Sequence, residues 1–223
     1  ENRNLHMKDI QALEKQVALV TGGGEGIGRA IALAFAAQKT QVIICGRRRE
    51  ALEATSGEIA AMGAEALVFP CDITRKEEIL EMVQQVIRSY DRLDILVNNA
   101  GRSGRTPIDD PDDSRWRDII EVNLTGTYLC SKAVLPHMIQ RGYGRIVNIS
   151  SVLGRFGVSG YAAYCTAKHG LLGFTKSLAL EVADRGVTVN AICPTWVDTA
   201  MARLGIEETA AVLGMTSATF REQ

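Results

Sequence analysis

The sequence has no excess of charge of either sign, no long apolar run and no leader-like N-terminus. Lysine and arginine number 25 against 26 aspartates and glutamates, which gives a net charge of −1. A near-neutral chain argues against nucleic-acid binding driven by counterion release, which needs a basic surface. No apolar run approaches the ~18 residues of a membrane span, and residues 1–4 lack the apolar segment of a secretory signal. We therefore expect neither a nucleic-acid partner nor a membrane partner.

Cysteine is scarce and irregularly placed. The five cysteines are widely spaced, and none forms a CxxC motif: Cys45, Cys71, Cys130, Cys165 and Cys193. An odd number of scattered cysteines indicates neither a zinc site nor a disulfide framework, so no metal site is expected. Free thiols are typical of a reducing compartment, which predicts a cytoplasmic protein.

The 223 residues, 46% of them hydrophobic, suffice for one large domain. Continuous Val/Ile/Leu runs predict strands buried on both faces, and the helical segments between them predict parallel βαβ units. The expected strands are residues 17–20, 42–45, 66–69, 93–97, 145–149 and 187–192. The expected helices are residues 27–38, 49–62, 76–90, 123–140 and 161–184. The pattern predicts an α/β fold with a doubly wound parallel sheet in a single domain at residues 8–223, after a tail at residues 1–7.

A glycine-rich turn joins the first expected strand to the first expected helix. Residues 21–28 read TGGGEGIG. Glycine allows a tight turn and close approach of the backbone to a pyrophosphate. The helix that follows offers free N–H groups and the positive end of its dipole to an anion. In this place the turn predicts a dinucleotide site on a Rossmann-type sheet, although the alternative of a purely structural turn remains open.

Three side chains predict acid–base chemistry. Tyr164 and Lys168 are four residues apart on an expected helix, so they share one face. A phenol with a pKa near ~10 is a poor base at neutral pH, and a nearby ammonium is expected to lower that pKa. Ser151 follows the fifth expected strand, where its hydroxyl can polarise a substrate carbonyl. Each residue alone also fits packing, solvation or a turn, and Ser150 competes with Ser151.

Several motifs follow one another in the order typical of one family. After the TGxxxGxG turn come Asn98-Asn99-Ala100-Gly101, then Asn123, Ser151 and the YxxxK pair Tyr164 and Lys168. From about Lys15 to Met201, the chain resembles the short-chain dehydrogenase/reductase family, closest to its 3-oxoacyl-thioester reductases and ketoreductases.

The resemblance implies a role for each matching residue. Tyr164 would exchange a proton with the substrate oxygen, Lys168 would also hold the nicotinamide ribose, and Asn123 would anchor a water that relays protons. The implied dinucleotide contacts are Thr21, Gly22, Gly24, Glu25, Gly26, Ile27, Gly28, Asp72, Ile73, Asn99, Ala100, Gly101, Tyr164, Lys168, Pro194, Val197 and Thr199. Structural alternatives are open for Asp72, as a helix N-cap with Thr74, and for Asn98, as a tie between strand ends.

The end of the second expected strand bears on cofactor choice. An acidic residue there would bond the ribose 2′-OH of NAD and repel a 2′-phosphate. This position is Gly46, and Arg47 follows it. Because arginine pairs with phosphate in bidentate fashion, NADP(H) is favoured over NAD(H). Glu25 argues in the opposite direction, since NADP-preferring relatives often carry a basic residue in the glycine-rich turn.

The substrate is expected to be a small carbonyl compound or alcohol. The sequence favours a 3-oxoacyl or other ketone reductase, and Leu180, where carrier-protein reductases carry a basic residue, weakens the case for a carrier-protein partner. Two alternatives are a non-catalytic dinucleotide sensor or scaffold and an NAD-dependent sugar or steroid alcohol dehydrogenase. Arg102, Arg105 and Arg155 hint at an anionic substrate group.

The resemblance also bears on assembly. Two long helices, about residues 123–140 and 161–184, predict a homodimer or homotetramer. Family members usually continue beyond the position where this sequence stops, so its C-terminal part is expected to be incomplete.

Overall fold

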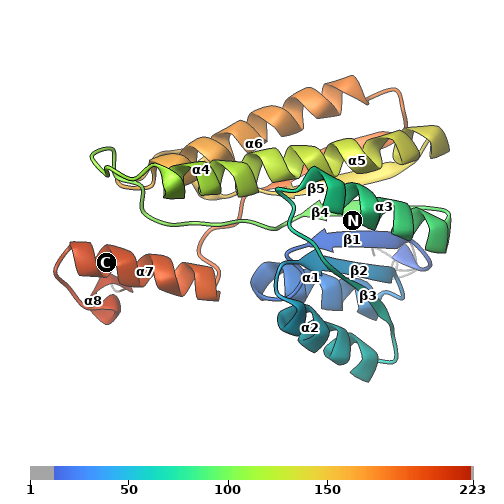
Figure 1. The fold of residues 1–223 in the computed structure, drawn as a ribbon, viewed down its shortest axis with the longest axis horizontal. Helices are drawn as coiled ribbons and strands as arrows, with labels where there is room; N and C mark the ends of the chain where they lie inside the picture. The colour runs from blue at the N-terminus through green and yellow to red at the C-terminus, as the bar shows by residue number, and fades with distance from the viewer. Residues whose placement is uncertain (1–12, 222–223) are drawn as a thin grey trace, which may run out of the picture.

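Six parallel strands form one sheet in the order β3-β2-β1-β4-β5-β6 (Figure 1). The computed structural model describes residues 13–221. The strands are β1 Val17–Thr21, β2 Gln41–Gly46, β3 Ala66–Pro70, β4 Ile95–Asn98, β5 Gly144–Ile149 and β6 Val187–Ile192. The order reverses at β1, which pairs with both β2 and β4. At such a switch point the connections leave to opposite faces, which opens a crevice at the carboxyl ends of the two strands.

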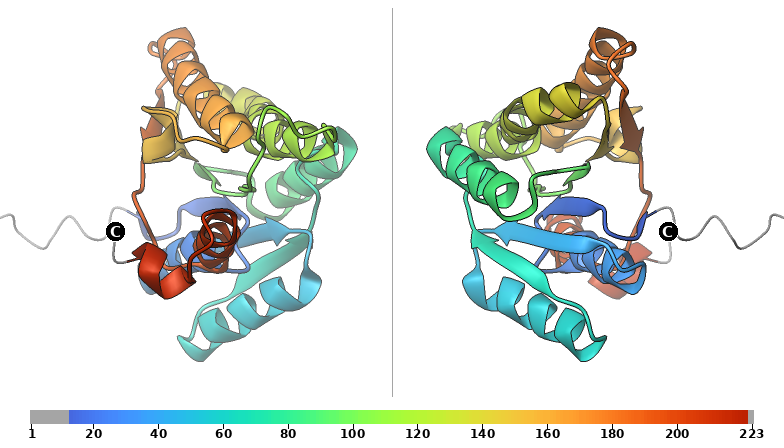
Figure 2. Two further views of the ribbon diagram at one scale, coloured as in Figure 1. Left: turned by 90° about the vertical axis from the view of Figure 1, so that its left-hand side faces the viewer. Right: turned by 90° about the vertical axis from the view of Figure 1, so that its right-hand side faces the viewer.

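Helices cover both faces of the sheet (Figure 2). They are α1 Gly26–Ala37, α2 Arg49–Ala61, α3 Lys76–Tyr90, α4 Ser114–Ile120, α5 Gly126–Arg141, α6 Ala162–Glu181, α7 Ala200–Val212 and α8 Ser217–Arg221. Helices α1 and α2 pack on one face, and α3, α5 and α6 pack on the other. Within residues 13–221, no helix combines the length and the apolarity needed to cross a bilayer.

The strands bury side chains on both faces, as their continuous apolar runs predict. Leu19 and Ile43 belong to the core under α3 and α5, whereas Val20 and Ile44 belong to the core under α1 and α2. All four side chains are fully buried. Each such burial contributes about 1.5–3 kcal/mol relative to an exposed side chain. The prediction of a doubly wound α/β sheet is therefore confirmed.

The element boundaries differ from the expectations mainly around the fourth connection. The expected helix at residues 123–140 begins only at Gly126, because Glu121–Thr125 forms a π-helical turn that joins α4 to α5. The expected strand at 93–97 is Ile95–Asn98. The tail expected at residues 1–7, and the start of the domain at residue 8, lie outside the described residues.

Asp94 fastens β4 to β1 and supports a stability prediction. Its carboxylate, which is 1% exposed, accepts hydrogen bonds from the Val17 N–H (2.8 Å) and from Arg92 Nε (2.6 Å) and Nη2 (2.8 Å). We expect Asp94→Ala to lower the free energy of unfolding by about 3 kcal/mol, because it leaves a buried N–H and a half-buried guanidinium unpaired. Urea denaturation measures the change. Asp184→Ala, which removes a solvent-exposed pair with Arg185, is the control and should change stability by less than about 0.5 kcal/mol; equal effects would contradict the prediction.

Candidate active site

The glycine-rich turn leads directly into the start of α1. Gly22 and Gly26 have φ values of +66° and +54°, a conformation that other residues rarely adopt. A Cβ on Gly28 would lie 2.2 Å from the Gly22 carbonyl oxygen. Only glycine therefore allows α1 to pack this closely against the turn. No side chain caps the first turn of α1, which leaves its N–H groups free. The turn therefore has the geometry and the polarity of a phosphate cradle.

Two residues expected to touch the dinucleotide, Thr21 and Asn99, also hold the cradle in place. The Thr21 hydroxyl is buried and accepts hydrogen bonds from the N–H groups of Asn99 and Ala100, both at 3.0 Å. The Asn99 side-chain amide donates to the carbonyl oxygens of Thr21 (3.0 Å) and Gly22 (3.2 Å). These bonds join the carboxyl ends of β1 and β4 on either side of the crevice.

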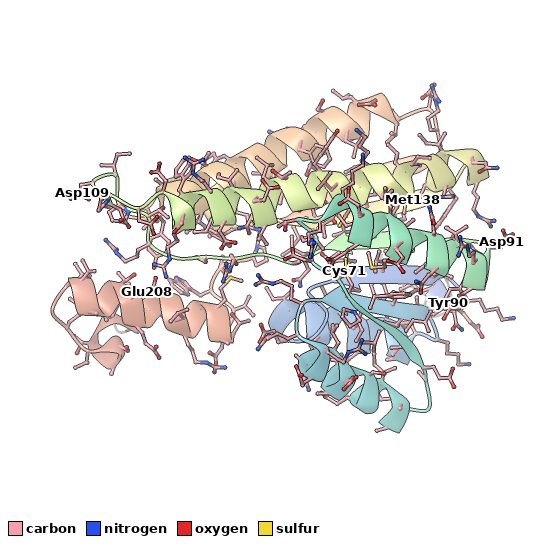
Figure 3. All side chains as sticks on the ribbon, in the orientation of Figure 1. Cys71, Tyr90, Asp91, Asp109, Met138 and Glu208 are labelled. Atoms are coloured by element: carbon pink, nitrogen blue, oxygen red, sulfur yellow. The ribbon has the colours of Figure 1, made fainter. Side chains whose placement is uncertain are left out.

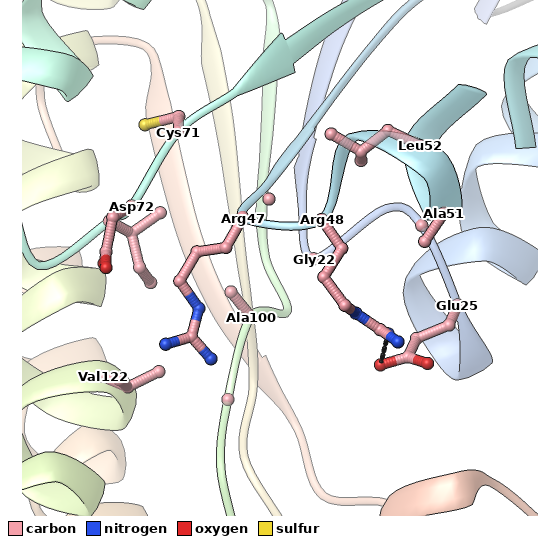
Figure 4. A pocket seen from close by; sticks show the side chains of 14 residues that line it. Gly22, Glu25, Arg47, Arg48, Ala51, Leu52, Cys71, Asp72, Ala100 and Val122 are labelled. Carbon is pink, nitrogen blue, oxygen red and sulfur yellow. Dashed lines mark ion pairs between the residues drawn. The ribbon is translucent and has the colours of Figure 1, made fainter.

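A pocket of about 390 Å³ lies beside the cradle at the carboxyl ends of β2 and β3 (Figure 4). Eight of its lining residues are among those expected to bind a dinucleotide: Gly22, Gly24, Glu25, Arg47, Asp72, Ile73, Ala100 and Gly101. The others are Gly46, Arg48, Ala51, Leu52, Cys71 and Val122. Ala51, Leu52, Cys71 and Val122 are apolar or small, so no charge or motif marked them in the sequence.

The charged groups of this pocket are Glu25 of the cradle, Arg47 and Arg48 after β2, and Asp72 after β3. Arg47 is exposed, and its side chain extends across the pocket between Asp72 and Ala100 (Figure 4). No carboxylate in the described part of the chain forms an ion pair with Arg47. Arg48 pairs with Glu25 of the cradle. The pocket thus presents one uncompensated guanidinium.

Asp72 bonds to Thr74 and lines the pocket, but it does not cap helix α3. Its Oδ1 accepts hydrogen bonds from the Thr74 N–H (3.0 Å) and hydroxyl (2.8 Å), and the residue also lines the pocket. The expected N-cap of α3 is wrong, because the helix begins at Lys76 and its N-cap position is Arg75. Asn98 ties the strand ends as expected: its amide donates to Asn148 (2.9 Å) on β5 and to Ser131 (3.0 Å) on α5.

The three side chains expected to carry the chemistry converge at the carboxyl end of β5. Tyr164 and Lys168 lie on one face of α6, with Lys168 Nζ 5.5 Å from the centroid of the Tyr164 ring. Lys168 is 4% exposed, and its Nζ donates to the Ile149 carbonyl oxygen at 2.8 Å. Ser151 begins the short 3-10 turn after β5, and its Oγ accepts from the Leu153 N–H. The competing Ser150 is buried and donates to the Lys168 carbonyl oxygen, a structural contact.

The pKa of Tyr164 corrects one expectation. Burial raises the pKa of the phenol, while a hydrogen bond with Ser151 lowers it. Burial also lowers the pKa of Lys168 to about 8. The expected lowering of the tyrosine pKa by Lys168 is thus not found, because desolvation of the phenolate dominates. The phenol is therefore protonated at neutral pH, as an unperturbed tyrosine also is, and burial makes it a weaker acid.

Asn123 lies in the π-helical turn and is 1% exposed. Its Nδ2 donates to the carbonyl oxygens of Arg102 (2.7 Å) and Ile119 (2.8 Å), and its Oδ1 accepts from the Arg102 N–H (3.3 Å). π-Helical turns are frequent at functional sites because they displace a side chain from the helical register. Here the displaced amide fixes the chain as it leaves β4.

The segment after β6 reaches back over the cradle. The Pro194 carbonyl oxygen accepts from the Val152 N–H at 3.0 Å, next to Ser151. Thr199 caps α7 by accepting from the Ala202 N–H at 3.2 Å, and a Cβ built on Gly26 would lie 3.2 Å from Thr199 Cγ2. Val197, between them, is exposed. This segment therefore connects the cradle to the side of the crevice that holds Ser151.

The outer wall of the crevice holds fewer free charges than the sequence indicated. Arg102 pairs with Asp118, and the Arg105 guanidinium lies 5.9 Å from the centroid of the Tyr161 ring. Arg155 is exposed. Two of the three arginines that hinted at an anionic substrate thus have partners within the protein.

Comparisons with known proteins agree with this geometry. The short chain dehydrogenase family matches residues 16–209. A putative ketoacyl reductase of Streptomyces coelicolor is 44% identical over 191 residues, which are 85% of this chain and 73% of that protein. Among solved structures, an actinorhodin polyketide ketoreductase variant with NADPH is similar with a TM-score of 0.89 and 42% identity, covering 94% of this chain and 80% of that one. An NAD⁺-bound xylitol dehydrogenase is similar with a TM-score of 0.86 and 35% identity, covering 90% and 78%.

Proposed function

Because the chain belongs to the short-chain dehydrogenase family, we propose that it interconverts a ketone and a secondary alcohol with NADP(H), as a 3-oxoacyl or other ketone reductase. The convergence of Ser151, Tyr164 and Lys168 beside the cradle carries this proposal. The uncapped first turn of α1 and the adjoining pocket fit a dinucleotide. When bound, the nicotinamide would supply the hydride for the carbonyl carbon.

The residues of the chain would supply binding, orientation and the proton. The N–H groups between Gly22 and Gly28 bind the pyrophosphate, and Lys168 holds the nicotinamide ribose. The Ser151 hydroxyl donates a hydrogen bond to the carbonyl oxygen and so stabilises the charge that develops there. Tyr164 gives its proton to the same oxygen as the alcohol forms. The nearby Lys168 cation stabilises the resulting phenolate, and Asn123 orders the chain beside it.

In the reductive direction, Tyr164 must carry the proton that it gives to the substrate oxygen. A phenol that stays protonated at neutral pH is ready to donate to a ketone oxygen, whereas oxidation of an alcohol needs the phenolate. A panel of ketones and alcohols, assayed with both NADPH and NADH at the nicotinamide absorbance band, tests the function. Oxidation of NADPH by a 3-oxoacyl thioester or a simple ketone is the expected result. Dinucleotide binding without turnover would instead support the sensor alternative.

The preference for NADP(H) depends on Arg47. A 2′-phosphate beside β2 would meet a guanidinium that has no carboxylate partner among the described residues. We expect Arg47→Ala to raise KM for NADPH about tenfold and KM for NADH by less than about twofold, because a charge-assisted phosphate contact is lost only with NADPH. Steady-state kinetics with each cofactor measure the split. Arg49→Ala, which breaks only the pair with Glu53 on α2, is the control. Equal changes for the two cofactors would contradict the assignment.

An NAD-dependent alcohol dehydrogenase is the second candidate. Glu25 favours it, since its carboxylate occupies the cradle and engages Arg48. The similarity to an NAD⁺-bound xylitol dehydrogenase also favours this candidate. Faster turnover of a polyol with NAD⁺ than of any ketone with NADPH would favour this candidate.

We also propose that the protein is a homodimer or homotetramer in the cytoplasm. Helices α5 and α6 carry exposed apolar side chains, Tyr128 and Leu180, of which Leu180 is 81% exposed. All five cysteines are unpaired, which fits a reducing compartment. Sedimentation analysis of the purified protein tests the assembly.

A further inference from the structure

Helix α7 lies beyond the carboxyl ends of the strands, on the side where the crevice opens (Figures 1 and 2). It begins directly after Thr199, next to the cradle, and ends near the segment at residues 102–113. Only Ile206 and Ala210 are buried among its residues, and apolar side chains such as Met201 and Leu204 remain exposed. With so little buried apolar surface, the position of α7 must depend on its polar contacts.

The first polar contact comes from Tyr161, at the start of the helix that carries Tyr164. Tyr161 is 8% exposed, and its hydroxyl lies 3.0 Å from the Gly205 carbonyl oxygen and 2.8 Å from the Thr209 hydroxyl. The Thr209 hydroxyl is itself 2.8 Å from the Gly205 carbonyl oxygen. Three oxygens from α6 and α7 thus form one hydrogen-bonded cluster.

Tyr161 is in turn fixed to the segment at residues 102–113. It forms a β-bridge with Thr106, whose N–H donates to the Gly160 carbonyl oxygen at 2.7 Å. The Thr106 hydroxyl accepts from the Ala163 N–H at 3.0 Å, at the first turn of α6. The backbone on both sides of Tyr161 is therefore fixed to Thr106.

The second polar contact is Glu208, on the side of α7 that faces the same segment (Figure 3). Its Oε1 accepts from Arg115 Nη2 at 2.6 Å, and its Oε2 accepts from the Arg105 N–H at 3.2 Å. The Glu208 side chain is only 21% exposed. Gly205, Glu208 and Thr209 are spaced i, i+3 and i+4, so all of these contacts occur on one face of α7.

We propose that Tyr161 and Glu208 latch α7 against the mouth of the crevice and thereby determine the affinity for the carbonyl substrate. The inference rests on the proposed function. Tyr161 and Glu208 are positioning residues, because they act through α7. Holding α7 in place lowers the ordering cost of binding, so a loosened helix should weaken substrate binding more than it slows the chemical step. No residue of α7 lines the pocket at the carboxyl ends of β2 and β3, so nucleotide binding there should be unaffected.

The test compares Tyr161→Phe and Glu208→Gln with two matched controls. Tyr143→Phe removes a hydroxyl at the opposite end of the sheet. This hydroxyl accepts a hydrogen bond from Gln16 Nε2 at 3.1 Å. Glu53→Gln removes a carboxylate paired within α2. We expect each latch variant to raise KM for the ketone about five- to tenfold with kcat changed by less than about twofold, as the loss of one or two hydrogen bonds implies. The controls should match the unchanged protein.

Two further measurements separate the latch from a general loss of structure. Binding of adenosine 2′,5′-bisphosphate should be unchanged in all four variants. Trypsin should cleave after Arg203, in the first turn of α7, faster in the latch variants than in the controls. An unchanged KM together with unchanged cleavage would overturn the latch, as would equal losses in KM, kcat and nucleotide binding. If no carbonyl compound is turned over, the proposed function fails, and the cleavage rates still decide whether α7 is latched.

Discussion

Replacing Tyr164 with phenylalanine should lower kcat for ketone reduction about 10³-fold while the protein still binds the dinucleotide. General acid catalysis contributes about 10²- to 10⁴-fold, and the phenol is the only group we assign to that step. The ring remains, so the packing around it on α6 changes little. Because Lys168 Nζ is held by the Ile149 carbonyl oxygen, it cannot easily move to replace the missing proton donor.

Kinetics with NADPH and the best ketone measure this loss, and quenching of protein fluorescence by NADPH measures binding. Tyr143→Phe is the matched control, since it removes a half-buried hydroxyl bonded to Gln16, far from the crevice. A loss smaller than tenfold in Tyr164→Phe would show that another group donates the proton. A parallel loss of binding would show that the variant disturbs the site rather than the chemistry.

The sequence predicted the sheet well because a buried parallel strand needs only a short apolar run followed by a helical segment. Six short apolar runs, separated by helical segments, leave little choice but parallel strands buried on both faces. The glycine-rich turn was equally readable, since positive φ values and close contacts leave glycine as the main option at Gly22, Gly26 and Gly28. Local pattern and global fold agree in these places.

The sequence was less informative where a side chain contacts a residue that is far from it in the sequence. Thr21 and Asn99 were predicted only as cofactor contacts, and the sequence did not show that their side chains join β1 to β4 across 78 positions. The pairing of Arg48 with Glu25 and the contacts of Tyr161 with α7 likewise depend on tertiary proximity. No periodicity or spacing carries such information.

The pKa of Tyr164 shows the same limit for electrostatics. The spacing of Tyr164 and Lys168 correctly places them on one helical face, but spacing does not reveal burial. Burial raises the pKa of the phenol and lowers that of the lysine, and both shifts disfavour charge in a dry site. The sequence therefore predicts that Tyr164 and Lys168 lie on one helical face. Only the three-dimensional structure shows whether the pKa of each side chain is raised or lowered.

Gly28→Ala should weaken NADPH binding about 100-fold. The new Cβ would lie 2.2 Å from the Gly22 carbonyl oxygen and 2.4 Å from Asn99 Nδ2, far inside van der Waals contact. Either the cradle widens or the Asn99 amide leaves the carbonyl oxygens of Thr21 and Gly22. Two unsatisfied polar contacts cost about 3 kcal/mol together, which corresponds to roughly 100-fold in affinity.

Gly57→Ala is the control, because nothing lies within 4 Å of a Cβ at that position on α2. Alanine in a helix interior is more favourable than glycine by up to about 1 kcal/mol, so this variant should bind NADPH normally and unfold at the same or a higher urea concentration. Titration calorimetry with NADPH compares the two proteins. Binding by Gly28→Ala within twofold of the unchanged protein would contradict the cradle. Weak binding with an intact urea transition would instead locate the defect in the turn between β1 and α1, where the phosphates are expected to bind.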